Sequence, residues 1–143
     1  MKIAVIDGQG GGIGRLIIEK LRKEFGQEVY IIGVGTNAVA TSVMLKAGAN
    51  DGASGENSVV WCASRVDMIA GSVAVIVANS YAGELTPRMA EAVASSPAMK
   101  ILIPMNRCNI EISSSQDEPL PLQVDQLVAR VRAHCQMCQD ADR

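Results

Sequence analysis

Aromatic residues and basic clusters are scarce in this sequence of 143 residues. Only 3% of the residues are aromatic, no run of Lys or Arg occurs, and the formal net charge is −2. Proteins that bind single-stranded nucleic acids combine a basic groove with aromatic side chains on which bases stack. The sequence therefore predicts no nucleic-acid partner.

Long apolar runs are missing as well. No apolar stretch approaches the ~20 residues that a membrane-spanning helix needs, and a strand pattern begins at Lys2. We therefore expect no membrane partner, no signal peptide and a cytoplasmic location. In that compartment the four cysteines are expected to be reduced thiols.

Glycine, by contrast, is concentrated near the start of the chain. The apolar run at residues 3–6 is typical of a strand buried on both faces, and Asp7 ends it. Five glycines then fall between positions 8 and 14, and a helical pattern follows at once. A strand, a glycine loop and a helix in this order place main-chain N–H groups and a helix N-terminus against an anion, usually a phosphate.

The spacing of these glycines indicates which class of phosphate-binding loop the sequence resembles. The dinucleotide spacing G-x-G-x-x-G fails, because Ile13 and Arg15 stand where the third glycine would be. Gly8, Gly12 and Gly14 instead fit G-x-x-x-G-x-G, which is similar to the cofactor loop of short-chain dehydrogenases. The alternative is that the glycines only permit a tight turn and close packing of helix on sheet.

The resemblance to short-chain dehydrogenases stops at this loop. Their catalytic Tyr-x-x-x-Lys is absent, since Val34 and Leu85 stand where the lysine would follow each tyrosine. The end of the second predicted strand also lacks the acidic residue that accepts ribose hydroxyls. This absence counts against a standard nicotinamide cofactor, although Thr36 and Asn37 can hydrogen-bond a sugar or an amide.

Apolar runs and helical periodicities alternate along the rest of the chain. We expect further strands over residues 28–34, 67–70, 73–78 and 100–104, an edge strand over 110–113, and a polar loop over 50–57. Helices are expected over residues 12–25, 38–47, 54–65 and 120–139, with another that starts at Thr86-Pro87. Buried strands joined by helices imply a parallel sheet with helices on both faces.

The predicted fold is therefore α/β, a three-layer Rossmann-like domain with a mostly parallel sheet of about five strands. Residues 1–143 are expected to form this single domain. Its α/β core covers residues 1–112, a polar linker covers 113–119, and the C-terminal helix covers 120–139.

Polar side chains follow the predicted strands where each strand ends, and ligands of such sheets bind beyond these ends. Arg107 suits a phosphate, Asn79 and Asn106 suit an amide or a base edge, and Glu84 lies nearby; turn capping is the alternative. The predicted cofactor-binding residues are Asp7, Gly8, Gln9, Gly10, Gly11, Gly12, Ile13, Gly14, Thr36, Asn37, Asn79, Ser80, Asn106 and Arg107.

Asp7 itself has three interpretations: it repels an anion, holds a metal ion, or accepts hydrogen bonds from the loop amides. No catalytic residue can be assigned from the sequence.

The tail residues His134, Cys135 and Cys138 resemble part of a metal or redox motif. A zinc site needs four ligands, and no second C-x-x-C is present. Because both cysteines fall on the apolar stripe of the last helix, we expect a buried pair and predict no metal site. Cys108 is expected to be an ordinary turn residue rather than a thiol of lowered pKa.

Four stretches of the sequence resemble one family of small bacterial proteins of about this length. They are IDGQGGGIG, GTNAVATSVMLKAGAN, GELTPRMAEA and KILIPMNRCNIEI. The family is known only as a domain of unknown function, and the resemblance ends near Val131, before the tail at 134–143. It implies a Rossmann-like domain without an assigned activity.

The sequence thus predicts a protein that binds a nucleotide or another phosphate-bearing small molecule at residues 8–14. The cofactor is left open, with NAD(P) and other nucleotides as the candidates. The alternative is a small oxidoreductase or transferase that uses a nucleotide cofactor, and a remote one is a thiol or metal protein that uses the tail cysteines. A homodimer or higher homo-oligomer is expected, because the apolar stripe of the last helix offers a surface for pairing.

Overall fold

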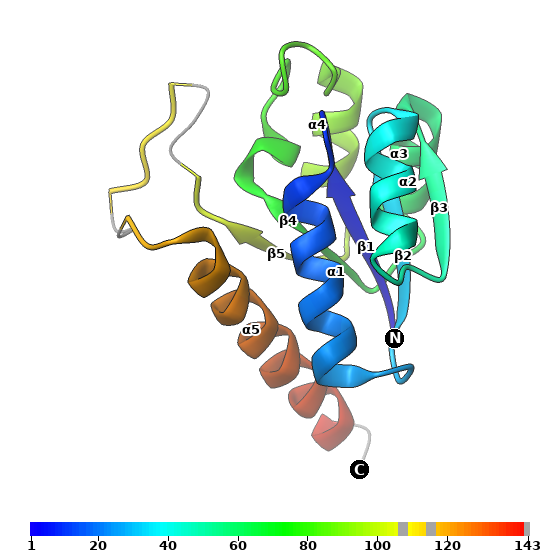
Figure 1. The fold of residues 1–143 in the computed structure, drawn as a ribbon, viewed down its shortest axis with the longest axis vertical. Helices are drawn as coiled ribbons and strands as arrows, with labels where there is room; N and C mark the ends of the chain where they lie inside the picture. Colours follow the sequence, from blue (N-terminus) through cyan, green and yellow to red (C-terminus); the bar gives the residue numbers. More distant parts are fainter. Residues whose placement is uncertain (106–108, 114–116, 142–143) are drawn as a thin grey trace.

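The computed structural model describes residues 1–105, 109–113 and 117–141 of the chain (Figure 1). Strands and helices alternate along it. The strands are β1 (Lys2–Asp7), β2 (Tyr30–Gly35), β3 (Asp51–Ser54), β4 (Met68–Ser72) and β5 (Met99–Ile103). The helices are α1 (Gly12–Phe25), α2 (Ala38–Lys46), α3 (Glu56–Ala63), α4 (Pro87–Ala94) and α5 (Leu120–Ala141), and a 3-10 turn, η1, covers Val73–Ile76.

The strands form one parallel sheet in the order β3-β2-β1-β4-β5. The chain moves outward from β1 to β3 and then returns to the other side of β1 for β4. Ile3 is accordingly paired with Ile31 on one side and with Met68 on the other. The strand order reverses beside β1, and in open α/β sheets the crevice at this reversal is where ligands bind.

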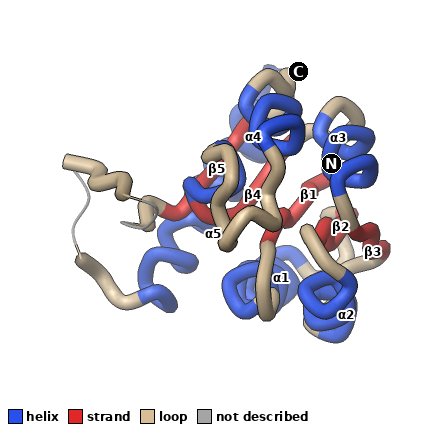
Figure 2. Tube along the Cα trace, turned by 90° about the horizontal axis from the view of Figure 1, so that it is seen from above, coloured by secondary structure: helices blue, strands red, loops and turns tan. Residues whose placement is uncertain are grey.

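Helices cover both faces of the sheet, so the molecule has three layers (Figure 2). Side chains alternate along β1: Ile3 and Val5 join the core under α1, α2 and α5, whereas Ala4 and Ile6 join the core under α3 and α4. The predicted three-layer Rossmann-like fold with a parallel sheet of five strands is therefore confirmed. None of the described helices is long and apolar enough to span a membrane.

Before β5, two expectations about strands were wrong, each for a physical reason. The run at residues 73–78 is not a strand: β4 pairs with β1 as far as Ala70 and with β5 as far as Ser72, and the chain then turns into η1. A short apolar run does not distinguish a strand from a buried turn of helix. Conversely, the predicted polar loop at 50–57 contains the edge strand β3, whose residues are exposed or half-buried and so carry no apolar signal.

The segment before α5 also differs from the prediction. Residues 110–113 do not form the expected edge strand. The expected helix is present as α5, and its residues Val124, Leu127, Val128 and Val131 are buried.

This stripe on α5 packs against α1 and β5 of the same chain. The surface that suggested homo-oligomers is therefore used within the chain, and oligomerisation stays a prediction. The expected buried cysteine pair is wrong in part, since Cys135 is half-buried and Cys138 is exposed.

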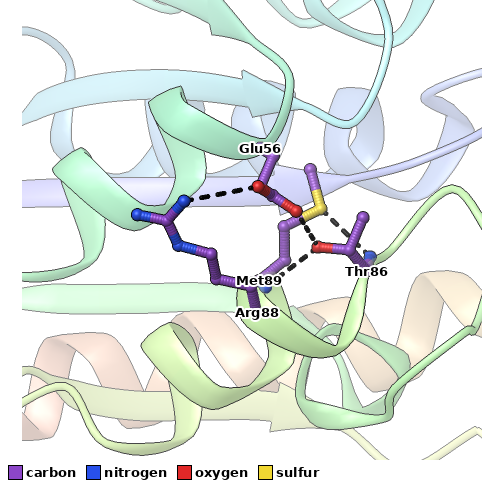
Figure 3. A network of polar contacts seen from close by, with 4 residues as sticks. All are labelled: Glu56, Thr86, Arg88 and Met89. Carbon is purple, nitrogen blue, oxygen red and sulfur yellow. Dashed lines mark hydrogen bonds and ion pairs between the residues drawn. The ribbon is translucent and has the colours of Figure 1, made fainter.

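Helices α3 and α4 start side by side and are joined by side chains at their N-termini (Figure 3). The Thr86 hydroxyl donates to Glu56 Oε2 at 2.7 Å and accepts the amide of Met89 at 3.2 Å. Arg88 lies 3.6 Å from Glu56 Oε1, and because both side chains are largely exposed this ion pair adds little stability. Thr86 is thus both the N-cap of α4, as its sequence position predicted, and the link to α3.

We predict that Thr86→Ala lowers the free energy of unfolding by about 1–2 kcal/mol, because it removes a helix cap and a contact between helices. Thr86→Ser keeps the hydroxyl and is the matched control, expected to lose much less. Urea unfolding followed by circular dichroism measures both. Equal stability of the two variants would contradict the role assigned to the hydroxyl.

Candidate functional site

The buried carboxylate of Asp7 holds the two ends of the glycine loop through hydrogen bonds. Asp7 is 2% exposed, its Oδ1 accepts the amide of Gly8 at 2.8 Å, and its Oδ2 accepts the amide of Gly14 at 2.7 Å. Burial raises the pKa of this carboxyl, and the bonds from the Gly14 and Gly8 amides oppose the rise. Of the three interpretations of Asp7, the one in which it accepts the loop amides is thus observed.

Not all the loop amides remain available to a ligand. Besides Gly8 and Gly14, the amide of Gln9 donates to Glu84 and that of Gly11 to the carbonyl of Gly8. Within the described part of the chain, no acceptor lies on the amides of Gly10 and Gly12. These two donors stand at the N-terminus of α1, where the helix dipole favours negative charge.

A cavity of about 410 Å³ opens on this loop, and we call it the glycine-loop cavity. It is lined by residues 7–13 and by Arg15, Leu16, Tyr81, Met105 and Leu120. Its polar side is therefore the loop together with Arg15, whose guanidinium is paired with Glu19 at 3.0 Å. Its other walls are largely apolar. Sequence reasoning missed Arg15, although its place in the first turn of α1 was a usable signal.

The glycines of the loop differ in what they do for the fold. Gly11 has a φ of +71°, and a Cβ there would lie 2.8 Å from Ala40 Cα; at Gly14 a Cβ would meet the Met44 sulfur at 2.6 Å. Close packing thus requires glycine at both positions. At Gly10 and Gly12 the φ is not left-handed. Apart from the two adjacent residues and the backbone of α1, no described atom lies within 4 Å of the place of a Cβ. The fold itself does not explain why these two residues are glycines.

The segment between η1 and α4, residues 79–84, lies against the glycine loop. Asn79, Tyr81 and Ala82 all have positive φ values, between 55° and 64°, an unfavourable backbone for residues with a Cβ. The Tyr81 ring closely approaches Gly8, where a Cβ would lie 2.7 Å from the ring, and its hydroxyl is 3.0 Å from Ser72 Oγ. Tertiary contacts therefore hold this segment in a strained conformation beside the loop.

Glu84 connects the 79–84 segment to two strand ends. Its Oε2 accepts hydrogen bonds from the Gln9 amide at 2.8 Å, the Thr36 hydroxyl at 2.5 Å and Asn37 Nδ2 at 3.0 Å. The Thr36 hydroxyl and the Gln9 amide hold the pKa of Glu84 below its ordinary value of 4.5. Asn37 also caps α2, because its side chain accepts the Ala40 amide.

The remaining predicted site residues lie elsewhere. Asn79 is exposed, and Ser80 is buried with its hydroxyl donated to the Ala74 carbonyl at 2.6 Å; neither lines the glycine-loop cavity. Asn106 and Arg107, like Cys108, lie outside the described residues. Met105, directly before them, does line the cavity.

A larger cavity, of about 680 Å³, lies at the opposite end of the sheet. Met1, Val29 and Asp67, which precede β1, β2 and β4, line it together with the tail cysteines. Cys138 Sγ lies 3.7 Å from His134 Nε2, and burial raises the pKa of the Cys135 thiol, which lowers its reactivity. The described residues contain no group of three or more His, Cys, Asp or Glu that could hold a metal ion.

The sheet order and the loop after β1 define a Rossmann-like α/β protein. The chain belongs to the family described as "Domain of unknown function (DUF3842)", whose model matches residues 2–136. The match reaches beyond Val131, where the resemblance in the sequence ended, and includes His134 and Cys135 but not Cys138.

Among solved structures, the chain is similar to one titled a dodecameric FMN-dependent Ubix-like decarboxylase from Escherichia coli O157:H7. The similarity covers 91% of this chain and 76% of that one, with 18% sequence identity and a TM-score of 0.47. No curated protein is similar enough in sequence to match.

The hydrogen bonds of Glu84 predict a pH effect on stability. Because its pKa is lower in the folded chain than in the unfolded one, its ionised form stabilises the fold above about pH 4.5. This contribution is lost as the pH falls through the folded-state pKa. We therefore expect wild type to be more stable than Glu84→Gln at pH 7, and the difference to shrink as the pH falls below 4.5.

Urea unfolding at a series of pH values between about 7 and 3 measures this difference. Glu91→Gln removes an exposed carboxylate from α4 and is the control for the loss of one negative charge. A difference between wild type and Glu84→Gln that stays constant over this pH range would contradict the prediction.

Proposed function

We propose that this protein binds a nucleotide or another small phosphate-bearing molecule in the glycine-loop cavity. The observation that carries the proposal is the pair Gly10 and Gly12. Both lack a Cβ where the fold has room for one, and both present an amide without an acceptor among the described residues. A ligand that approaches the backbone closely accounts for both facts.

The phosphate is placed at the polar side of the cavity. The amides of Gly10 and Gly12, the N-terminus of the 14-residue helix α1 and the Arg15 guanidinium all favour an anion there. Asp7 carries a carboxylate beneath the loop, but both its oxygens are occupied by loop amides. Its part in the site is to set the shape of the loop.

The rest of the ligand is placed against the apolar walls. Leu16, Tyr81, Met105 and Leu120 offer aliphatic and aromatic surface to a ring or another apolar group. A volume of about 410 Å³ is within the range of small-molecule sites. The cavity thus suits a molecule with one charged end and one apolar end, a description that nucleotides meet.

We predict that Gly10→Ala and Gly12→Ala leave the fold intact and abolish binding. Replacing glycine by alanine at a compatible φ changes stability by only about 0.4–1 kcal/mol in the stabilising direction, whereas the new methyl groups would enter the cavity. Thermal shift with inorganic phosphate, pyrophosphate, AMP, ADP, NAD, NADP and FMN measures binding. The redox cofactors in this panel also test the alternative of a cofactor-dependent oxidoreductase.

Wild type should be stabilised by at least one of these compounds, and the alanine variants should keep its melting temperature but lose the ligand response. Stabilisation of wild type by none of them, or unchanged binding by both alanine variants, would remove the proposal.

Arg15 provides a second, independent prediction. Arg15→Gln removes the cation that lines the cavity and should weaken binding of a phosphate-bearing ligand by about tenfold, as expected for a charged hydrogen bond. Lys23→Gln removes an exposed cation from the last turn of the same helix and is the matched control. Isothermal titration calorimetry at fixed ionic strength compares the two. An equal loss in both variants would indicate a general effect of charge rather than a contact.

A further inference from the structure

The end of β2 lacks an acidic residue in the sequence, yet the structure brings a carboxylate there from another segment. Residues 33–37 are uncharged, whereas Glu84 lies within hydrogen-bonding distance of both Thr36 and Asn37. It comes from the 79–84 segment, 48 residues beyond Thr36. In dinucleotide-binding sheets an acid at this place accepts the ribose hydroxyls.

The three hydrogen bonds orient the carboxylate of Glu84. All of them reach the same atom, Oε2, and they come from the glycine loop and from the end of β2. Among the described residues no donor lies on Oε1. One oxygen is therefore used to fix the carboxylate, and the other remains an acceptor for a ligand.

Gln9 places this acceptor next to the proposed phosphate site. Gln9 lines the glycine-loop cavity, and its own amide donates to Glu84. Gln9 directly precedes Gly10, so a phosphate on the amides of Gly10 and Gly12 has Gln9 as a neighbour. The strained backbone at Tyr81 and Ala82, just before Glu84, shows that the segment is held in place at an energetic cost, as is common where a side chain must be positioned.

We propose that Glu84 accepts the hydroxyls of a ribose and so selects nucleotides with a free 2′,3′-diol. The inference rests on the proposed function, because it places the sugar of that ligand at the border of the glycine-loop cavity, next to Gln9, which lines the cavity, and toward Glu84, which lies beside it. A diol donates two hydrogen bonds and suits an ionised carboxylate, whereas a 2′-phosphate would meet a like charge. The ligand class is therefore a ribonucleotide without a phosphate on its 2′ oxygen.

The test compares four probes on wild type and on Glu84→Gln by isothermal titration calorimetry at fixed ionic strength. The probes are ADP, 2′-deoxy-ADP, adenosine 2′,5′-bisphosphate and inorganic pyrophosphate. Wild type should bind ADP about tenfold more tightly than 2′-deoxy-ADP, the size expected for a hydrogen bond to a charged group. It should bind the 2′-phosphate probe more weakly still.

Glu84→Gln should bind ADP about tenfold more weakly than wild type does, lose the preference for ADP over 2′-deoxy-ADP, and bind pyrophosphate as wild type does. Thr36→Val removes one of the three orienting donors but keeps the charge, and it should weaken ADP binding by less. Glu91→Gln, remote from the loop on α4, is the control for charge alone.

Each other result overturns a specific claim. Tighter binding of all four probes by Glu84→Gln would mean that Glu84 competes with the ligand for the same donors, and it would overturn the diol role. Binding of pyrophosphate with no difference between ADP and 2′-deoxy-ADP in wild type would overturn the diol role and keep the phosphate site. Binding of none of the probes by wild type would overturn the proposed function, and the diol role with it.

Discussion

The carboxylate of Asp7 is the contact on which the geometry of the glycine loop depends. Its two oxygens accept amides from the two ends of the loop, Gly8 and Gly14, and thereby fix how the chain leaves β1 and enters α1. A buried carboxylate without such donors would be costly. Because the loop amides are such donors, the buried carboxylate is tolerated at the end of β1. In the loop that Asp7 holds, the amides of Gly10 and Gly12 have no protein acceptor among the described residues.

Packing around the loop separates glycines that the fold needs from glycines that it does not. Gly11 and Gly14 are required by the close approach of Ala40 and Met44 from α2, and Gly8 by the Tyr81 ring. Helix α2 and the Tyr81 ring therefore both pack against the loop, and the loop is open to the glycine-loop cavity on its remaining side. A count of five glycines in seven positions cannot make this distinction, because it depends on neighbours that lie 29 to 73 positions away in the sequence.

Local patterns predicted most of the fold and only part of the site. The unit of β1, loop and α1 follows from neighbouring residues, as does the helix start at Thr86, and both were correct. The errors arose where a local pattern is ambiguous: the apolar run after β4 forms η1, and the polar strand β3 has no apolar face. In the candidate site, Thr36 and Asn37 were predicted and Glu84 was expected near the same strand ends. That Glu84 is their common hydrogen-bond partner was not predicted, because a contact across 48 residues leaves no local signal.

The sequence at the end of β2 contains no acidic residue, but the folded chain brings the carboxylate of Glu84 to that place. A side chain at the end of β2 would be positioned by its own strand, whereas Glu84 has to be positioned by a loop. Three features hold that loop in place. Asn79, Tyr81 and Ala82 have left-handed backbone conformations, the Tyr81 hydroxyl contacts Ser72, and the following helix is capped by Thr86 and linked to α3 through Glu56. Glu84 follows β4, which lies on one side of β1, and it contacts residues that follow β2, on the other side of β1. Its carboxylate therefore links the two halves of the sheet at the place where the strand order reverses. The contact of Thr86 with Glu56 thus fixes the start of α4 two residues after Glu84, so the packing of α3 on α4 anchors the segment that brings Glu84 to Thr36 and Asn37.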